Sequence, residues 1–248
     1  MARELDQATR WLRLPLAFDV EGLRADLGIA TAWHWQTHYN DRAHRGSWTS
    51  IALRSASGEA GDIQAWEGAD FRDSPLLARC PGFREAVDSF ACEKKAVRLM
   101  ALAPGAEIMP HRDRGGSLED GLARLHIPIV TDPAVVFTLD GEEVHFSAGA
   151  TWYMNANCLH AVRNGSTRER VHLVLDCVPN AWLLALFEAS GWRPAPPPKY
   201  GDPNIDDANV GAVIAALRAS GNPAAEALAA QLETASSDRY GKAAPMLG

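Results

Sequence analysis

Two histidines and one aspartate in the second half of the chain have the types and spacing of a metal site. His111 and Asp113 stand two residues apart, so in an extended segment they point to one face. His160 begins a predicted strand later in the chain, and a late barrel strand can lie beside an early one. Two imidazoles and one carboxylate leave three coordination positions open, as in non-haem Fe(II) sites. The ligands alone do not name the metal, because zinc or manganese could also occupy a cupin-type site of this composition.

Arg170 adds a cation beside these ligands. In a hairpin centred on Gly165, His160 and Arg170 face each other across the ladder and point to the same side. A buried arginine needs a carboxylate, which its planar fork binds bidentately. A dicarboxylate that chelates the metal at one end would place its other end there. A metal-dependent cupin isomerase or lyase would not need Arg170, and a non-catalytic binding protein would need neither the cation nor the metal.

The segment from Arg124 to Pro128 predicts a strand with two unlike faces. Arg124 and His126 share one face, and Leu125 and Ile127 take the other. Two such polar groups are costly to bury without anions. The first face is therefore either solvated or holds an anion near the metal, and beside the ligands and Arg170 we favour the anion.

Candidate substrate-binding residues fall in two regions. The first is an N-terminal stretch rich in polar and aromatic groups that could line an entrance, and the second is the set of arginines close to the ligands in sequence, which could hold a substrate carboxylate. Core packing explains the aromatic residues equally well, and solvation explains the arginines. The candidates are His38, Trp48 and Arg54, then Arg112, Arg114 and Arg163.

The elements that must position these residues are mostly short strands. Alternating patterns separated by turns predict strands over 96–103, 123–130, 134–139, 142–146, 151–154, 159–163 and 170–178. Asp140-Gly141 is a hairpin signal, and Asn164-Gly165-Ser166 predicts a second turn. Earlier in the chain, 19–27 and 85–91 favour helix and 48–55 favours a strand. This layout is typical of a largely antiparallel barrel or sandwich with flanking helices.

We expect three regions. Residues 1–92 supply mixed α/β elements that pack on the core and contribute to the entrance, residues 93–180 form the β core, and residues 181–248 form a helical extension. That extension contains a helix over 181–189, a proline-rich linker over 193–203 and two alanine-rich helices over 207–220 and 223–234. The terminal helices could pack back on the core or pair with a second copy in a homodimer.

Composition excludes several classes of protein. A formal net charge of -7 and 47% hydrophobic residues favour one globular domain with an appendage and no nucleic-acid partner. No stretch approaches the ~20 apolar residues of a membrane span, and the N-terminus lacks the pattern of a signal peptide. The 4 cysteines show no CxxC pair, which argues against a disulfide or zinc framework and favours a cytoplasmic protein.

Four separated motifs, in order, resemble the aspartyl/asparaginyl β-hydroxylase family. They are LAPGAEIMPHRD (102–113), RLHIPI (124–129), FTLDGEEVHFSAGATWYMNANCLHAVRNGS (137–166) and RVHLVLD (170–176). The resemblance covers roughly residues 95 to 180 and implies a cupin-like double-stranded β-helix, or jelly roll. The family includes bacterial hydroxylases of free amino acids such as the L-proline cis-4-hydroxylases. Asp113 places the chain nearer to these, because the vertebrate peptidyl enzymes carry glycine at that position.

The resemblance implies an Fe(II)- and 2-oxoglutarate-dependent dioxygenase. His111, Asp113 and His160 would bind iron, Arg170 the distal carboxylate of 2-oxoglutarate, and Arg124 and His126 would approach its metal-side end. Such an enzyme consumes O2 and hydroxylates an unactivated C–H bond of an amino acid or amino-acid derivative, with succinate and CO2 as co-products. A peptide or protein Asp/Asn substrate is the alternative. Asn155 stands where many relatives carry aspartate.

Overall fold

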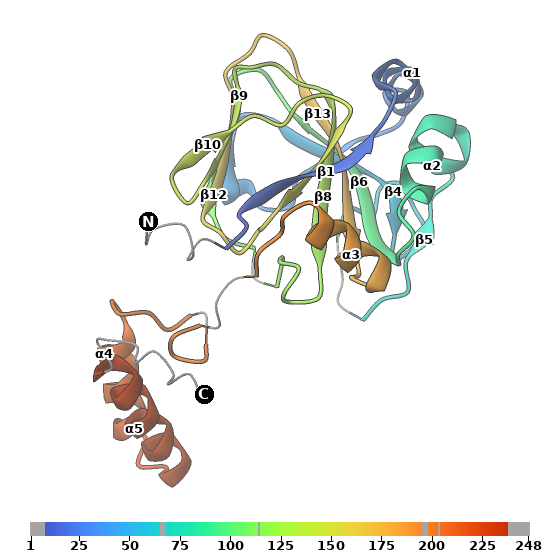
Figure 1. Cartoon of the computed structure of the whole chain (residues 1–248). Coiled ribbons are helices and arrows are strands. Elements are labelled where there is room, and N and C mark those ends of the chain that lie inside the picture. The colour runs from blue at the N-terminus through green and yellow to red at the C-terminus, as the bar shows by residue number, and fades with distance from the viewer. Residues whose placement is uncertain (1–7, 65–67, 114, 195–197, 203, 238–248) are drawn as a thin grey trace, which may run out of the picture. The chain divides into compact units, whose positions relative to one another are not determined.

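The computed structural model describes residues 8–64, 68–113, 115–194, 198–202 and 204–237. The chain divides into two compact units, Met1–Pro194 and Ala195–Gly248. Figure 1 shows the strands of the first unit, which are β1 Trp11–Ala17, β2 Gln36–Thr37, β3 His44–Arg45, β4 Trp48–Ser55, β5 Arg72–Asp73, β6 Lys94–Leu102, β7 Glu107–His111, β8 Ala123–Val130, β9 Val135–Leu139, β10 Glu142–Val144, β11 Ala150–Met154, β12 His160–Asn164 and β13 Arg170–Cys177. Its helices are α1 Val20–Ala30, α2 Pro81–Asp88 and α3 Ala181–Ala189, with 3-10 turns at Asp41–Ala43 and Leu77–Arg79.

The strands form two antiparallel sheets that face each other. The larger sheet has the order β1-β11-β8-β13-β6-β4-β2, with β5 beside β4, and the smaller sheet has the order β10-β9-β12-β7-β3. From β6 to β13 each connection crosses to the other sheet, except for the step from β9 to β10, which is a hairpin. This winding is a double-stranded β-helix, so the predicted jelly-roll core is confirmed.

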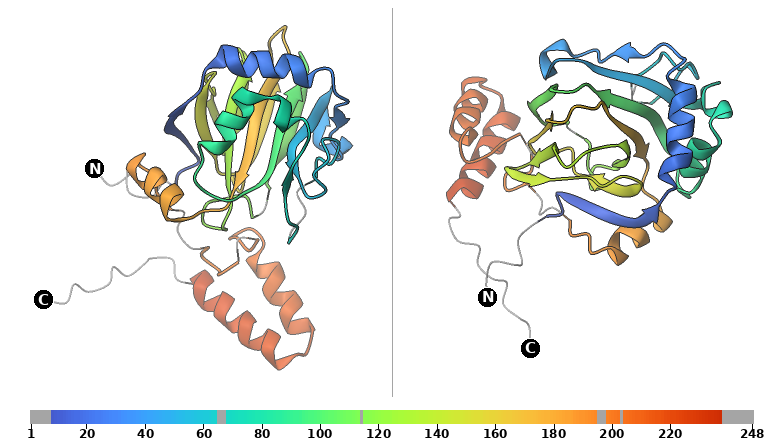
Figure 2. Two further views of the ribbon diagram at one scale, coloured as in Figure 1. Left: turned by 90° about the vertical axis from the view of Figure 1, so that its right-hand side faces the viewer. Right: turned by 90° about the horizontal axis from the view of Figure 1, so that it is seen from above.

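The N-terminal region completes the larger sheet. β1 pairs with β11 and β4 pairs with β6, so residues from both ends of the first unit share one sheet. The strand β1 was not predicted from its sequence. Asp19 starts α1 by accepting the backbone N–H groups of Glu21 and Gly22, which would otherwise lack partners. The helices α1 and α2 lie against the outer face of the larger sheet (Figure 2).

Two hydrophobic clusters hold this arrangement. Outside the larger sheet, alternate strand residues such as Leu99, Leu125 and Leu173 pack against Leu23 of α1 and Phe83 of α2. Between the sheets, a second cluster lines the barrel interior with Trp48, Leu102, Ile108, Phe137, Leu139 and Val162. Within a strand of the larger sheet, successive residues thus point to the outer cluster and to the barrel interior in turn, as a pleated strand requires.

The predicted hairpin at Asp140-Gly141 is confirmed. Leu139 pairs with Glu142, so the loop between β9 and β10 holds two residues. Asp140 has φ 46° and Gly141 has φ 86°, the positive values that this tight turn needs.

The helix α3 belongs to the first unit, whereas residues 181–189 were expected in the C-terminal extension. Asn180 caps it, and Leu183 and Phe187 are buried in the outer cluster. In the second unit, α4 Val210–Ala219 and α5 Pro223–Ser237 form a helical hairpin, in which Val210, Leu232 and Tyr200 are buried. A homodimer through these helices stays a prediction. None of the helices in the described part of the chain is long and apolar enough to cross a membrane.

Candidate metal centre

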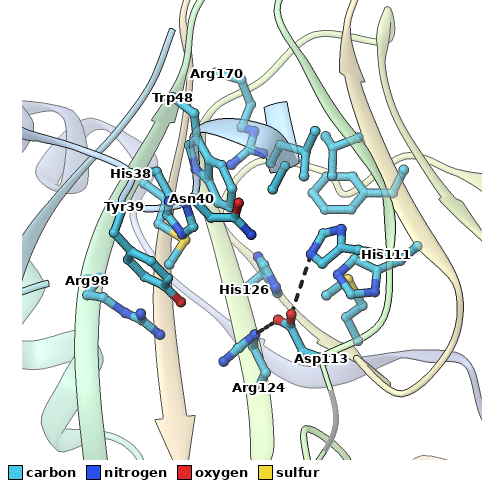
Figure 3. Close-up of a pocket in the computed structure, with 17 residues that line it drawn as sticks. His38, Tyr39, Asn40, Trp48, Arg98, His111, Asp113, Arg124, His126 and Arg170 are labelled. Atoms are coloured by element: carbon cyan, nitrogen blue, oxygen red, sulfur yellow. Dashed lines mark hydrogen bonds and ion pairs between the residues drawn. The ribbon is translucent and has the colours of Figure 1, made fainter. Parts of the chain in front are cut away.

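The structure brings the three predicted ligands together at one end of the smaller sheet. His111 ends β7, His160 begins β12, and the two residues are paired across the ladder. Asp113 follows in the loop after β7, where its backbone N–H donates to the Ala156 carbonyl at 2.9 Å. Candidate ligand atoms of the three side chains all lie within 4.8 Å of one another, and Figure 3 shows His111 and Asp113 converging.

Both histidines are set up to present the same ring nitrogen. His111 Nδ1 lies 2.8 Å from the Met109 carbonyl and His160 Nδ1 lies 3.0 Å from the Cys158 carbonyl. A carbonyl only accepts, so each Nδ1 carries the proton and each Nε2 presents a lone pair. Metal-bound histidines are typically oriented in this way. Burial lowers the pKa of His160, which favours the neutral form that a metal needs. The donor set therefore fits a divalent metal ion.

Asp113 is held in its ligand orientation by an arginine. One of its oxygens lies 3.5 Å from His111 Nε2, and the other accepts from Arg124 Nη1. Burial alone would raise the pKa of Asp113, but Arg124 together with the two ligand histidines outweighs burial and lowers it. Asp113 is therefore an anion at neutral pH and can ligate a cation without first losing a proton.

Behind Arg124 lies a buried chain of charges. Asp176 accepts from Arg124 Nε at 2.8 Å and from Arg98 Nη2 at 2.6 Å. Asp176 is 1% exposed and Arg98 is 5% exposed. The ordered chain Arg98–Asp176–Arg124–Asp113 fixes the position of the metal carboxylate. Two of its members, Arg98 and Asp176, were not predicted as site residues.

The ligands open into one cavity of about 260 Å³. Its walls come from both sheets, so the site lies inside the barrel rather than on its rim. Among the predicted residues, the cavity walls include His38, Trp48, His111, Asp113, Arg124, His126, His160 and Arg170; its other walls are Tyr39, Asn40, Ala43, Arg98, Met100, Ile108, Phe137, Met154 and Val162.

Arg170 is a buried cation without a carboxylate partner among the described residues. It is 3% exposed, and its Nε has no hydrogen-bond partner there. Its guanidinium carbon lies 5.5 Å from the centre of the Phe137 ring. Burial lowers its pKa to about 10, which leaves it charged at neutral pH. Figure 3 places Arg170 at the opposite end of the pocket from Arg124 and Asp113.

The predicted pairing of His160 with Arg170 is wrong, although both reach the pocket. His160 pairs with His111 and Leu139 in the smaller sheet, whereas Arg170 pairs with Leu102 in the larger sheet. The Asn164-Gly165-Ser166 turn is a corner between sheets and not a hairpin. Asn164 holds this corner, because its side-chain amide donates to the carbonyls of Leu102, Ala103 and Arg168.

The strand Ala123–Val130 has the two faces that its sequence predicts. Leu125, Ile127 and Ile129 enter the outer core, while Arg124 and His126 face the pocket. The anions beside Arg124 are Asp113 and Asp176 of the protein itself. His126 is 5% exposed, and its Nε2 has no partner among the described residues.

Of the substrate-binding candidates, some line the cavity and others do not. His38 and Trp48 line the pocket and stack at 3.5 Å between ring centres, and burial is the first cause that lowers the pKa of His38 to about 4. Arg54 instead binds Asp73 and the Lys94 carbonyl, away from the pocket. Arg112 binds the Asn157 carbonyl and lies 3.6 Å from Asp140.

The two remaining arginine candidates, Arg163 and Arg114, are not found on the cavity wall among the described residues. Arg163 points outward from β12 and is exposed. Arg114 lies outside the described residues. Arg54, Arg112 and Arg163 do not line the cavity, because an ion pair, a backbone carbonyl and solvent engage them elsewhere, so the structure gives no support for their assignment to the substrate.

Asn155 has a local structural role. Its side-chain oxygen accepts the backbone N–H of Asn157 at 3.0 Å, and its backbone carbonyl accepts that of Cys158 at 3.1 Å. The resulting turn leads the chain into His160. An aspartate could accept the same hydrogen bond, so the amide does not alter the shape of this turn.

Sequence comparisons match a large part of this chain to known proteins. The sequence model described as aspartyl/asparaginyl beta-hydroxylase matches residues 19–179. L-proline cis-3-hydroxylase 1 from a Streptomyces species is 25% identical over 167 residues, which are 65% of this chain and 57% of that protein. The chain thus spans less than two thirds of the length of that curated relative.

Solved structures show weaker likeness. A 2OG-Fe(II) oxygenase family oxidoreductase from Burkholderia pseudomallei is 14% identical with a TM-score of 0.49, covering 68% of this chain and 85% of that one. A prolyl-4-hydroxylase from Pseudomonas putida is 15% identical with a TM-score of 0.42, covering 69% and 94%. These structural similarities are too low to assign the family, so the assignment depends on the sequence match. Because that match spans more than half of the chain and includes the metal triad and Arg170, the chain belongs to the aspartyl/asparaginyl β-hydroxylase family.

Proposed function

We propose that this protein is an Fe(II)- and 2-oxoglutarate-dependent dioxygenase that hydroxylates a C–H bond of an amino acid or amino-acid derivative. The observation that carries the proposal is Arg170, a buried cation that lacks a protein carboxylate and shares one cavity with the His111/Asp113/His160 ligands. A cupin that uses only a metal would have no need for this cation. The relative named L-proline cis-3-hydroxylase 1 supports the amino-acid class.

The metal and the distal carboxylate of 2-oxoglutarate would bind at different ends of the cavity. The three ligands would hold Fe(II), which supplies the O2-dependent oxidation chemistry when bound. Arg170 would hold the distal carboxylate of 2-oxoglutarate through its planar fork. His126, with an unpartnered ring nitrogen in the same cavity, would hydrogen-bond the metal-side end, and Arg124 would keep Asp113 ionised and aligned.

Charge in the cavity supports a substrate with one carboxylate. The described charges on the cavity wall are three arginines (Arg98, Arg124 and Arg170) and Asp113, and Asp176 lies behind the wall against Arg98 and Arg124, which together leaves one positive charge. A divalent metal and a dianionic 2-oxoglutarate cancel each other, so that positive charge remains for the substrate. Arg98 lines the cavity and has an unpartnered Nε–H, so it is the arginine we assign to the substrate carboxylate.

The amine end of the substrate has no such partner. The one carboxylate among the described residues that line the cavity is Asp113, which is committed to the metal and Arg124. Asp176, behind the cavity wall, is committed to Arg98 and Arg124. Tyr39, 64% exposed, and Asn40 supply neutral polar groups on the cavity wall. We therefore expect the carboxylate to be required and the substrate nitrogen to tolerate a neutral form.

The experiment is a coupled succinate-release screen with Fe(II), 2-oxoglutarate and O2. Free amino acids, their N-acetyl derivatives, their carboxamides and short peptides are compared with the uncoupled background. We expect release with free or N-acetylated amino acids and none with carboxamides. Release with peptides alone would favour the peptide hydroxylase alternative. If no candidate gives release and the wild type does not bind 2-oxoglutarate, the proposal fails.

A further inference from the structure

A second histidine lies behind His126, inside the barrel. His172 is completely buried on β13, and its Nδ1 lies 3.4 Å from Nδ1 of His126 on β8. The ring of His172 stacks on Phe137 with 5.5 Å between centres and a 16° interplanar angle. His126 lines the cavity, whereas His172 does not. His172 therefore contacts the site only through His126.

Both imidazoles are neutral at neutral pH. Burial, followed by the positive charge of Arg170, lowers the pKa of His126 and of His172 well below the ordinary value. A neutral imidazole has one N–H donor and one bare nitrogen. A contact between two Nδ1 atoms can therefore be a hydrogen bond in only two ways, and each fixes the tautomer of both rings.

The two arrangements give His126 Nε2 opposite hydrogen-bonding roles toward the cavity. If His172 Nδ1–H donates, His126 carries its own proton on Nε2, the ring nitrogen with no protein partner among the described residues. If His126 Nδ1–H donates, its Nε2 presents a lone pair instead. A carboxylate or keto oxygen only accepts, so an acceptor ligand beside His126 is compatible with the first arrangement alone.

We propose that His172 is a positioning residue that holds His126 as the Nε2–H tautomer, so that His126 donates to the metal-side end of 2-oxoglutarate. The inference rests on the proposed function, because it takes 2-oxoglutarate as the ligand of this cavity. The separation of 3.4 Å is long for a hydrogen bond, and such bonds are often long before the ligand that uses them arrives. The relay runs from His172 Nδ1–H to His126 Nδ1, and from His126 Nε2–H to the co-substrate.

The test uses the full-length protein loaded with Zn(II), which is diamagnetic. Long-range 1H–15N correlations of the histidine rings report which nitrogen of His126 and of His172 carries the proton. With 2-oxoglutarate bound, we expect His126 protonated on Nε2 and His172 protonated on Nδ1. A His126 ring protonated on Nδ1 in this complex would overturn the inference without the need for any variant.

Variants separate the hydrogen bond from packing. His172→Phe keeps an aromatic ring against Phe137 but removes the donor, and we expect about tenfold weaker 2-oxoglutarate binding with Zn(II) affinity unchanged. His172→Asn places an amide donor near the position of Nδ1 and should recover most of the affinity. His145→Phe is the control, because His145 bonds the Val135 carbonyl and lies off the cavity walls.

The outcomes distinguish the two proposals. If the wild type binds 2-oxoglutarate and His172→Phe binds it equally well, only the role of His172 is overturned. Equal losses in the Phe and Asn variants would also overturn it, because they would indicate packing alone. If the wild type with metal does not bind 2-oxoglutarate, the proposed function is overturned and the inference with it.

Discussion

Replacing Arg170 with methionine should stabilise the ligand-free protein while removing its response to 2-oxoglutarate. Burial lowers the pKa of Arg170 from its ordinary value to about 10. At about 1.4 kcal/mol for each unit of pKa, keeping this charge in the fold costs about 3 kcal/mol. Methionine removes that cost and keeps an unbranched apolar stem, but it loses the contact with the Phe137 ring, worth about 1 kcal/mol. The free energy of unfolding without ligand should therefore rise by about 2 kcal/mol.

The assay is thermal unfolding at neutral pH, with and without 2-oxoglutarate, on protein loaded with Zn(II). Because Arg170 is a base with a lowered folded-state pKa, the cost is present at every pH below about 10 and is relieved only above it. For a chain of this size, about 2 kcal/mol corresponds to a Tm increase of about 4–8 °C. Wild type in 2-oxoglutarate at a hundredfold excess over its Kd should gain about 2.7 kcal/mol, and the variant should gain nothing.

Arg163→Met is the matched control, because Arg163 is exposed on β12 and should change neither quantity. A less stable ligand-free Arg170→Met protein would mean that the arginine is not an uncompensated charge. A variant that keeps the wild-type shift with 2-oxoglutarate would show that the dicarboxylate binds elsewhere.

Other changes test the metal site and its supports. Alanine at any one of the three ligands should abolish metal binding and turnover without changing the far-UV circular dichroism, and an Asp113→Ala protein with wild-type metal affinity would refute that ligand. Asp176→Asn leaves two buried arginines without their shared carboxylate and should lower the free energy of unfolding by about 3–5 kcal/mol, whereas Asp73→Asn, at a partly exposed ion pair, should cost less than about 1 kcal/mol. Burial would raise the pKa of Asp176, but the charges of Arg124 and Arg98 outweigh burial and lower this pKa from 3.8. The ionised carboxylate therefore stabilises the fold above pH 3.8, and the difference between wild type and Asp176→Asn in urea unfolding should shrink at lower pH. Asn164→Ala removes the donor that holds three carbonyls at the corner before Arg170 and should cost about 2 kcal/mol in the same assay.

Most strands of the core were predictable because each has a regular pattern on its two faces, whereas β7 was not predicted as a strand. The strand Ala123–Val130 has its predicted bounds, and the alternation of its residues correctly puts Arg124 and His126 together on one face, which lines the pocket. The Asp140-Gly141 turn was equally clear, since a two-residue loop with positive φ values favours this pair. In both places, residues close together in the sequence determine the structure.

Pairing between distant strands was not local, and there the prediction was wrong. A turn at Gly165 is compatible with a hairpin or with a corner between two sheets, and the difference lies in Asn164 bonds to the carbonyls of Leu102 and Ala103, 61–62 residues away. Arg170 nevertheless reaches the predicted site, because the interior of a narrow barrel brings both sheets to one cavity.

Arg98 and Asp176 were missed for the same reason. Each lies within a mostly apolar strand that also carries other charges, Lys94 and Lys95 on β6 and Arg170 on β13. The signal that could have identified Arg98 and Asp176 is that each alternates with the outward-facing apolar residues of its strand and therefore points into the barrel. Their ion pair joins residues 78 positions apart. Arg112 and Arg163 were proposed because they are close to the ligands in sequence, but closeness along the chain does not give orientation, and neither lines the cavity. Arg163, for example, shares β12 with His160 but is exposed.

Anaerobic titration of the full-length protein with Fe(II) and 2-oxoglutarate tests the central claim most directly. We expect a weak visible metal-to-ligand charge-transfer band that saturates with 2-oxoglutarate, is absent from Asp113→Ala and requires much higher 2-oxoglutarate in Arg170→Met. A folded wild-type protein that binds Fe(II) but gives no such band at any 2-oxoglutarate concentration would contradict the assignment of this cavity to the co-substrate.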